Sequence, residues 1–317
     1  MWRQLKKRNP EKVEVWLRGG LGNQLFQYAF ARQLSERKSS KLIIRSDLLP
    51  TGEDTFNGHS RWPEQISSFN HKGELFARRH QPLSGTHLLS KAMTLQRLAS
   101  DFAPKSMARL GVIAGNRFLD WDLVSSQVSG KPRLSLNNYF NDTRPLIHLR
   151  ETLRDEIRAV LQPSPRMFLE ASRVSEKMAI HIRLGDNMFL KTSLLEKYVD
   201  VIHTAMEELD TLNLSPEFAL FSDDMPLALR VLKEAGLDSH RVSVVDDDGL
   251  QPIETLFILS NCSGLIASPS TFAWWGGFLQ EKADNPVIFK SPWSIDPRNA
   301  PTEKIFLSEW LLLPKDY

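Results

Sequence analysis

The sequence predicts an α/β protein made of two Rossmann-like halves, the second of which is a doubly wound parallel sheet. Two observations support this prediction. Short apolar runs alternate along the chain with longer segments of helical periodicity, which is the pattern of parallel α/β architecture. A length of 317 residues allows one large core or two packed halves, and the alternation in both parts of the chain favours two halves.

The N-terminal half begins with a strand at residues 13–17, which leads through Gly19-Gly20 into a helix with one apolar face. A second strand follows at 41–45. Residues 51–145 have only moderate periodicity, so we expect long loops and helices there. Loops that vary on a rigid sheet commonly carry specificity, so this stretch is expected to select a binding partner.

A helix over residues 146–161 is closed by Pro163 and Pro165 and predicts a domain boundary. We therefore expect an N-terminal domain of residues 1–162 and a C-terminal domain of residues 163–317. The second domain alternates regularly, and ligands of such a sheet bind beyond the carboxyl ends of its strands. Its predicted strands are 178–183, 218–222, 242–245, 264–267 and 287–289, and its predicted helices are 191–209, 225–235, 252–261 and 271–282.

Composition excludes several classes of protein. The formal charge of +2 is too small to indicate a nucleic-acid partner, which requires a concentrated basic face. Cys262 is the only cysteine, so no disulfide can form within the chain. No apolar run approaches the roughly 18 residues that span a bilayer, and the N-terminus has no apolar block typical of a signal peptide. We expect a cytoplasmic protein, at most peripheral to the inner membrane face.

One local excess of charge lies at the N-terminus, where Arg3, Lys6, Lys7 and Arg8 surround Leu5. A solvated, frayed terminus would explain this run. Weak attraction to an anionic membrane surface is the alternative, and the sequence leaves both open.

The segment HIRLGD at residues 181–186 ends a predicted strand. Side chains alternate along a strand, so His181 and Arg183 share one face, and Gly185 allows a sharp turn afterwards. The guanidinium of Arg183 is a planar fork of donors that fits a diphosphate and stays charged at any relevant pH. An ion pair between arginine and aspartate that holds the turn is the alternative, and spacing alone does not decide.

The segment SPSTFAWWGG at residues 268–277 places hydroxyl side chains between a strand and a helix. The unpaired amides at such a helix start can bind phosphate through their N–H donors and the helix dipole. N-capping by Ser270 is the alternative, and the two interpretations are compatible. A stripe at helical spacing predicts aromatic packing in the core, and it comprises Phe272, Trp275, Phe278 and Leu279.

Two further segments place polar groups at strand ends. In RGGLGNQ at residues 18–24, Gly20 and Gly22 match half of a dinucleotide fingerprint, but the third glycine is missing, so the NAD signature is poor. Asn23 and Gln24 instead offer amide donors and acceptors. In LFSDD at residues 220–224, the acids Asp223 and Asp224 suit the ring nitrogens of guanine, with capping of the next helix as the alternative.

Together these segments resemble glycosyltransferase family 11, the α-1,2-fucosyltransferases. The matching segments stand in the family's order and are GGLGNQLFQYA (19–29), HIRLGD (181–186), FSDD (221–224), STFAWWGG (270–277) and VIFKSPW (287–293). The resemblance spreads over most of the chain. It implies a GT-B-like pair of domains, in which residues 1–162 form the acceptor side, with residues 51–145 selecting the acceptor, and residues 163–317 bind GDP-fucose. It also implies an inverting, metal-independent transfer of L-fucose from GDP-fucose to the 2-hydroxyl of a terminal galactoside in a glycan. A bacterial surface polysaccharide is the implied acceptor class.

The resemblance also implies roles for individual residues, with GDP-fucose as the donor substrate and no separate cofactor. Arg183 would neutralise the diphosphate, and Asp186 or His181 would accept the proton of the acceptor hydroxyl. The residues expected to border the donor or the reacting centre are Gly20, Gly22, Asn23, Gln24, Asp223, Asp224, Ser270, Thr271 and Phe272.

Three positions depart from the family pattern. Leu184 stands where the family usually has a second arginine, Pro269 replaces an asparagine, and Asn187 replaces a common tyrosine. Strand alternation predicts that Leu184 points to the opposite face from Arg183, so its presence need not empty the diphosphate site.

Two rival interpretations remain. A metal-dependent transferase with a single nucleotide-binding domain would use Asp246 and Asp248, which follow a strand in an Asp-x-Asp arrangement that can hold a divalent cation. The departures at Leu184 and Pro269 would instead suit a non-catalytic protein that binds a nucleotide sugar or a glycan.

Overall fold

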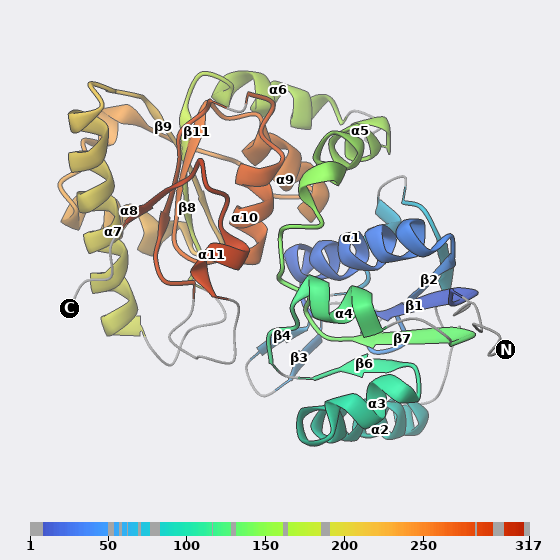
Figure 1. The fold of residues 1–317 in the computed structure, drawn as a ribbon. Coiled ribbons are helices and arrows are strands. Elements are labelled where there is room, and N and C mark those ends of the chain that lie inside the picture. The colour runs from blue at the N-terminus through green and yellow to red at the C-terminus, as the bar shows by residue number, and fades with distance from the viewer. Residues whose placement is uncertain are drawn as a thin grey trace, which may run out of the picture. The chain divides into compact units, whose positions relative to one another are not determined.

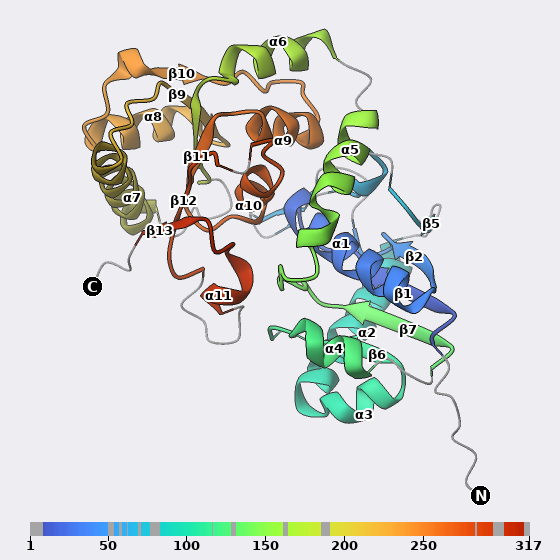
Figure 2. The same ribbon diagram turned by 45° about the horizontal axis from the view of Figure 1, so that its top comes forward.

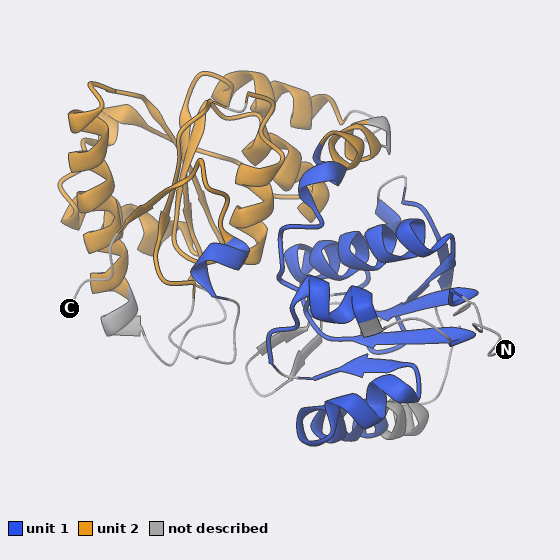
Figure 3. Cartoon of the chain, viewed as in Figure 1, with its two compact units in different colours: residues 1–54, 61–150, 295–305 blue, residues 55–60, 151–294, 306–317 orange. Residues whose placement is uncertain are grey.

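The computed structural model describes residues 9–49, 54–56, 59–61, 63–68, 71–76, 83–115, 117–127, 131–160, 164–184, 191–282, 284–293 and 301–313. The chain divides into two compact units, which Figure 3 colours separately. Unit 1 comprises residues 1–54, 61–150 and 295–305, and unit 2 comprises residues 55–60, 151–294 and 306–317. None of the described helices combines the length and apolar composition needed to cross a bilayer.

Unit 1 is built on a five-stranded parallel sheet in the order β5-β2-β1-β7-β6 (Figure 1). From β1 the chain steps to β2 on one side, and β7 later returns to its other side, so a topological switch point lies between β1 and β7. The strands are β1 (Lys12–Trp16), β2 (Lys41–Arg45), β5 (Glu74–Phe76), β6 (Val112–Ala114) and β7 (Arg133–Asn137). A separate two-stranded sheet pairs β3 (Asp54–Phe56) with β4 (His59–Arg61).

The helices of unit 1 differ sharply in burial. The helix α1 (Leu21–Lys38) is buried along most of its length and shares a face of the sheet with α4 (Trp121–Gln127), since Phe30 packs edge-on against Trp121 at 5.0 Å between ring centroids. The helices α2 (Leu83–Phe102) and α3 (Pro104–Arg109) lie beside β6 (Figures 1 and 2) and carry many exposed side chains.

The expected strands at 13–17 and 41–45 and the helix after Gly20 are confirmed. Residues 51–145, expected to hold loops and helices, also contribute three strands of the sheet, and one of them, β7, pairs directly with the central strand β1. The strand β7 escapes sequence patterning because polar residues interrupt its apolar positions, and the central one, Ser135, accepts a hydrogen bond from Nε1 of Trp16 at 3.1 Å.

Unit 2 contains a six-stranded parallel sheet in the order β10-β9-β8-β11-β12-β13. Its strands are β8 (Met178–Ile182), β9 (Phe218–Ser222), β10 (Val242–Val244), β11 (Gly264–Ala267), β12 (Val287–Lys290) and β13 (Leu311–Leu313). The predicted strands of this half are therefore confirmed, and β13 is an addition. Only three residues long, β13 has too little pattern of its own and is defined by its pairing with β12.

The helices of unit 2 follow the predicted alternation, and a buried apolar cluster between α7, α8 and the sheet includes Ile182, Leu184 and Val201. The predicted helices are observed as α7 (Lys191–Thr211), α8 (Met225–Glu234), α9 (Pro252–Ser260) and α10 (Thr271–Phe278), and α6 (Pro165–Val174) is an addition. Of the predicted core stripe, Trp275, Phe278 and Leu279 are buried as expected, whereas Phe272 is only half-buried. Trp274, which the stripe did not include, is fully buried as well. Two Rossmann-like units with wholly parallel sheets agree with the GT-B-like fold implied by the resemblance.

The unit boundary falls after Arg150, the first residue of α5 (Arg150–Val160), whereas the Pro-rich segment at residue 162 was expected to mark it. The side chain of Arg154 explains the difference. Its guanidinium donates to the carbonyls of Leu279, at 3.1 Å, and Gln280 just after α10, so α5 packs with unit 2.

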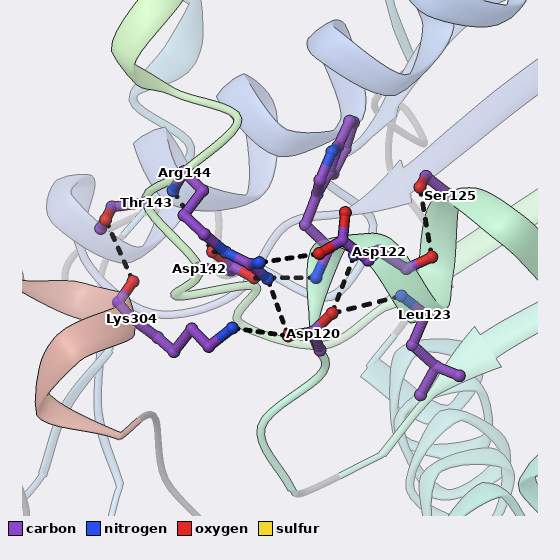
Figure 4. Close-up of polar contacts among 9 residues, drawn as sticks. Asp120, Asp122, Leu123, Ser125, Asp142, Thr143, Arg144 and Lys304 are labelled. Carbon is purple, nitrogen blue, oxygen red and sulfur yellow. Dashed lines mark hydrogen bonds and ion pairs between the residues drawn. The ribbon is translucent and has the colours of Figure 1, made fainter.

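A charged network joins distant segments within unit 1 (Figure 4). The guanidinium of Arg144 contacts the carboxylates of Asp120 and Asp122 at 2.7 Å each and of the fully buried Asp142 at 2.6 Å. Hydrogen bonding to Asp142 raises the pKa of Arg144. Lys304, on α11 (Thr302–Ile305), donates to Asp120 at 3.2 Å, and its carbonyl accepts from the amide of Thr143 at 3.0 Å. The network therefore ties α11 to unit 1.

Candidate functional site

A topological switch point in unit 2 defines the first candidate site. The strand β8 is flanked by β9 on one side and β11 on the other, with His181 in register with Ala267 of β11 and Ile182 in register with Ser222 of β9. From β8 the chain proceeds to β9 and β10, and only later returns to β11 on the opposite side. Crevices form at the carboxyl ends of strands at such points and commonly bind ligands.

The peptide of Arg183 at this switch point is held by Tyr198, which extends from α7. The Tyr198 hydroxyl donates to the carbonyl of Arg183 at 2.7 Å and accepts from its amide at 3.1 Å. The same hydroxyl accepts from Oγ of Ser268 at 2.8 Å. Because Tyr198 is buried, its pKa is raised, so it remains a neutral donor. One hydroxyl thus links the residues that follow β8 and β11.

The next residue, Leu184, is anchored to the end of β9. Its amide donates to Oδ1 of Asp223 at 2.7 Å. Its side chain is buried in the apolar cluster beside α7, together with Ile182 and Val201. Leu184 therefore shares the buried face of Ile182, as strand alternation predicts for these two residues. An arginine at position 184 would bring a charge into this core in the present conformation.

The two predicted acids have different local partners. Asp224 is the N-cap of α8 and accepts from the amide of Leu227 at 3.2 Å, as the capping alternative predicted. Asp223 instead fixes the turn after β8 through its bond with Leu184. Capping of α8 therefore explains Asp224 but not Asp223.

The start of α10 lies after β11 and carries the predicted hydroxyl residues. Ser270 is the N-cap, and its Oγ accepts from the amide of Ala273 at 3.5 Å. Thr271 and Phe272 form the first turn and are half-buried. Phe272 is less buried than Trp275 and Phe278, which are fully buried. Its ring contacts that of His181, with 5.7 Å between the two centroids. Phe272 thus borders the face of β8 that carries His181, and Thr271 precedes it in the same helical turn.

His181 is buried and neutral. Burial, with the nearby charge of Arg183, lowers the pKa of His181 from 6.5 to about 4. Within the described part of the chain, Nδ1 of His181 has no hydrogen-bond partner. A histidine with this pKa is a weak base at neutral pH, so its expected role as proton acceptor is disfavoured. The other expected acceptor, Asp186, lies outside the described residues, as does Gly185.

The glycine-rich turn after β1 occupies the corresponding position in unit 1. Gly19 has φ +71°, and a Cβ there would meet Nδ2 of Asn23 at 2.7 Å, so this position requires glycine. Gly20 is the N-cap of α1, and Gly22 is buried in its first turn. Asn23 remains partly exposed. The turn therefore brings backbone and the Asn23 amide close to the carboxyl end of β1.

Gln24 serves the fold of this turn. Its Nε2 donates to the carbonyls of Gly19 at 2.7 Å and Pro63 at 2.8 Å, and its Oε1 accepts from the amide of Gln65 at 2.9 Å. Gln24 is fully buried, and both amide hydrogens are used, so we correct its expected donor-binding role to a structural one.

Sequence reasoning missed the side chains that hold the two strand ends. Gln27 accepts from the amide of Arg18 at 2.8 Å and donates to its carbonyl at 3.3 Å, just as Tyr198 pairs with both peptide groups of Arg183. Both side chains sit within helices at core positions. A tyrosine or glutamine at such a position has no sequence signal that distinguishes a backbone contact from packing.

The acidic segment considered as a metal site forms an ion-paired turn. Asp246 pairs with Arg166 at 2.6 Å and accepts from the amide of Asp248 at 3.3 Å. Burial raises the pKa of Asp247 between them. Over the described ranges, no three His, Cys, Asp or Glu side chains gather into a group that could hold a metal ion.

Comparisons with known proteins agree over most of the chain. The family model described as Glycosyl transferase family 11 matches residues 12–313. An alpha-1,2-colitosyltransferase of Escherichia coli is 22% identical, and the match covers 89% of this chain and 92% of that protein. The O-antigen biosynthesis glycosyltransferase WbnK of Escherichia coli is also 22% identical, over 94% of this chain and 99% of the relative.

Among solved structures, an Arabidopsis thaliana FUT1 mutant in complex with GDP matches with a TM-score of 0.49 and 14% identity, covering 93% of this chain and 73% of that chain. The NodZ alpha-1,6-fucosyltransferase soaked with GDP-fucose matches with a TM-score of 0.45 and 15% identity, covering 86% of this chain and 93% of that chain.

Proposed function

Because the chain belongs to glycosyl transferase family 11, we propose that it transfers L-fucose from GDP-fucose to the 2-hydroxyl of a terminal galactoside in a glycan. The transfer inverts the anomeric carbon and needs no metal ion. The partners are therefore a nucleotide sugar and a galactose-terminated glycan, without a separate cofactor.

The Tyr198 link is the observation that best supports a donor site in unit 2. Through one hydroxyl it connects the peptide of Arg183, after β8, with Ser268, two residues before the N-cap of α10. A guanidinium and a helix start that follow neighbouring strands suit a diphosphate, because both offer positive potential and N–H donors. In this proposal Arg183 neutralises the diphosphate, and Thr271 and Phe272 border its sugar end.

The proposed transfer requires stabilisation of the leaving group, GDP. GDP departs with growing negative charge from an oxocarbenium-like state, and a fixed cation with N–H donors stabilises that charge more in the transition state than in the ground state. Ser270 contributes by starting α10, because its hydroxyl caps the helix. Neutral His181 adds no second charge beside Arg183. Asp186 is the proposed acceptor of the proton from the sugar hydroxyl.

Two remaining roles follow from the family. Asp223 is the better candidate to face guanine, since Asp224 caps α8. Asn23, with Gly20 and Gly22 at the start of α1, is proposed to serve the acceptor and the reacting centre. The colitosyltransferase among the relatives supports a deoxy-L-sugar as the transferred group and makes a colitose nucleotide the natural competitor to test.

A turnover assay tests the proposal. The purified chain is incubated with GDP-fucose and lactose, and released GDP and the product's linkage are measured, the latter by nuclear magnetic resonance. We expect an α-1,2-linked fucose and undiminished turnover in excess EDTA. Binding of GDP-fucose without release of GDP would favour a binding protein, and loss of turnover in EDTA would favour a metal-dependent transferase. A parallel reaction with the colitose nucleotide decides between the two sugars.

A further inference from the structure

The helix α2 in unit 1 presents apolar side chains to solvent. Leu95, Leu98 and Phe102 are 65%, 44% and 88% exposed, and Phe102 is the most exposed large apolar side chain in the described part of the chain. At 3.6 residues per turn, these positions and Lys91 fall within about 60° of one another around the helix axis. They therefore form one stripe along the outer face of α2.

Over residues 91–102, whose side chains the structure describes, the opposite face of α2 makes polar contacts beside the half-buried Met93. Nδ2 of Asn137, at the end of β7, donates to Oε1 of Gln96 at 2.9 Å and to the carbonyl of Met93 at 3.3 Å. Nε of Arg97 donates to the carbonyl of Gly115 at 3.0 Å. A helix on the surface of a globular protein normally turns its apolar stripe toward the core, whereas residues 91–102 of α2 turn Leu95, Leu98 and Phe102 toward solvent.

The charges around the stripe have one dominant sign. Lys91, Lys105 and Arg109 are exposed, and Leu110, at the end of α3, is 75% exposed. Between residues 91 and 111, the acids amount to Asp101 alone, which is half-buried. We name this surface the α2–α3 patch, comprising Lys91, Leu95, Leu98, Phe102, Lys105, Arg109 and Leu110.

We propose that the α2–α3 patch docks the protein on an anionic bilayer surface. Exposed apolar side chains flanked by lysine and arginine suit the boundary between headgroups and acyl chains, where the apolar groups insert and the cations meet anionic lipid. The formal charge of the whole chain is only +2, so the attraction comes from this local arrangement. Figures 1 and 2 show α2 and α3 side by side next to β6.

Vesicle binding tests the proposal without any need for turnover, so its outcome is separate from that of the proposed function. The full chain is mixed with vesicles of phosphatidylcholine alone, and with vesicles containing phosphatidylglycerol in roughly one lipid of three, and bound protein is measured by flotation. We expect binding only to the anionic vesicles. Leu95→Ser with Phe102→Ser should weaken that binding by about tenfold or more, because it removes the two most exposed apolar groups of the stripe.

Two controls sharpen the result. Phe168→Ser with Leu169→Ser removes apolar side chains of comparable exposure, 49% and 68%, from α6 of unit 2 and should leave vesicle binding unchanged. Neutralising Arg3, Lys6, Lys7 and Arg8 tests the basic run at the N-terminus as the source of attraction. Equal binding by wild type and the α2 variant would overturn the proposal. So would a wild-type dimer that the α2 variant converts to a monomer without vesicle binding, which would identify a second copy as the occupant.

Discussion

Replacing Tyr198 by phenylalanine removes one hydroxyl and three hydrogen bonds. The amide and carbonyl of Arg183 lose their contacts at 3.1 and 2.7 Å, and Ser268 loses one at 2.8 Å. Ser268 is half-buried and can turn toward water, whereas the two peptide groups of Arg183 lose a partner on the buried side. A buried polar group without a partner costs about 1–3 kcal/mol, so we expect a stability loss of about 2 kcal/mol.

The functional consequence is expected at the donor site. If the hydroxyl fixes Arg183 against the start of α10, its loss should lower kcat/KM for GDP-fucose by about tenfold, and GDP affinity measured by calorimetry should fall with it. Tyr28→Phe is the matched control in unit 1. The Tyr28 hydroxyl is buried and accepts from the amide of Lys72 at 2.8 Å and from Arg32 at 3.3 Å.

The comparison separates positioning from packing. Both variants should lose a similar amount of unfolding free energy in urea, but only Tyr198→Phe should change the GDP affinity. If Tyr198→Phe is destabilised and still binds GDP as tightly as wild type, the hydroxyl serves the core alone. The reasoning about Arg183 would then be refuted.

Three further predictions follow from named contacts. Arg183→Ala should keep the fold but lower turnover by about 10²–10³-fold. The control Arg230→Ala removes only a surface ion pair with Glu234 and should keep wild-type turnover. Equal turnover in both variants would contradict the assigned role of Arg183. Because the pKa of His181 is lowered to about 4 in the folded protein, this histidine takes up a proton in the unfolded chain first as the pH falls. The free energy of unfolding should therefore decline between about pH 6.5 and 4, by about 3 kcal/mol at most. Urea unfolding of wild type and His181→Gln at both ends of that window should show a smaller decline in the variant. Arg144→Gln removes the guanidinium that pairs with the buried Asp142 carboxylate and leaves it the backbone amides of Trp121, at 2.8 Å, and of residue 144, at 3.2 Å. We expect a loss of about 3 kcal/mol in thermal or urea unfolding. Lys304→Gln, at a partly exposed pair, should cost about 1 kcal/mol or less, and similar losses in both variants would show that burial of Asp142 is unimportant.

The regular alternation of unit 2 could be predicted from the sequence because most of its strands are buried runs with helices between them. Unit 1 was harder, since β5 and β6 are three residues long and β7 mixes polar and apolar positions. Such strands are defined by their partners in the sheet, which local patterning does not reveal.

Motifs predicted where polar groups gather but not what each one contacts. Strand alternation is consistent with Leu184 lying in the buried cluster with Ile182, and helix-start chemistry correctly identified Ser270 as a cap. The side-chain amide of Gln24 uses its hydrogen-bonding groups on the backbone, and the hydroxyl of Tyr198 contacts Ser268, which lies 70 residues further along the chain. Both arrangements depend on tertiary structure. For these side chains, residue type and local spacing carry no information about the partner.

The assignment of α11 to unit 1 has a practical meaning for dividing this enzyme. The N-terminal stretch cut at residue 150 would lack Lys304, leaving Asp120 and the backbone of Thr143 without contacts made by a segment more than 150 positions downstream. The complementary stretch would contain α11 but would lack Asp120 and Thr143, the residues that α11 contacts through Lys304. Neither structural unit is a single continuous segment of the sequence. We therefore expect the two stretches to be recovered as soluble proteins only when they are produced together or re-joined by circular permutation.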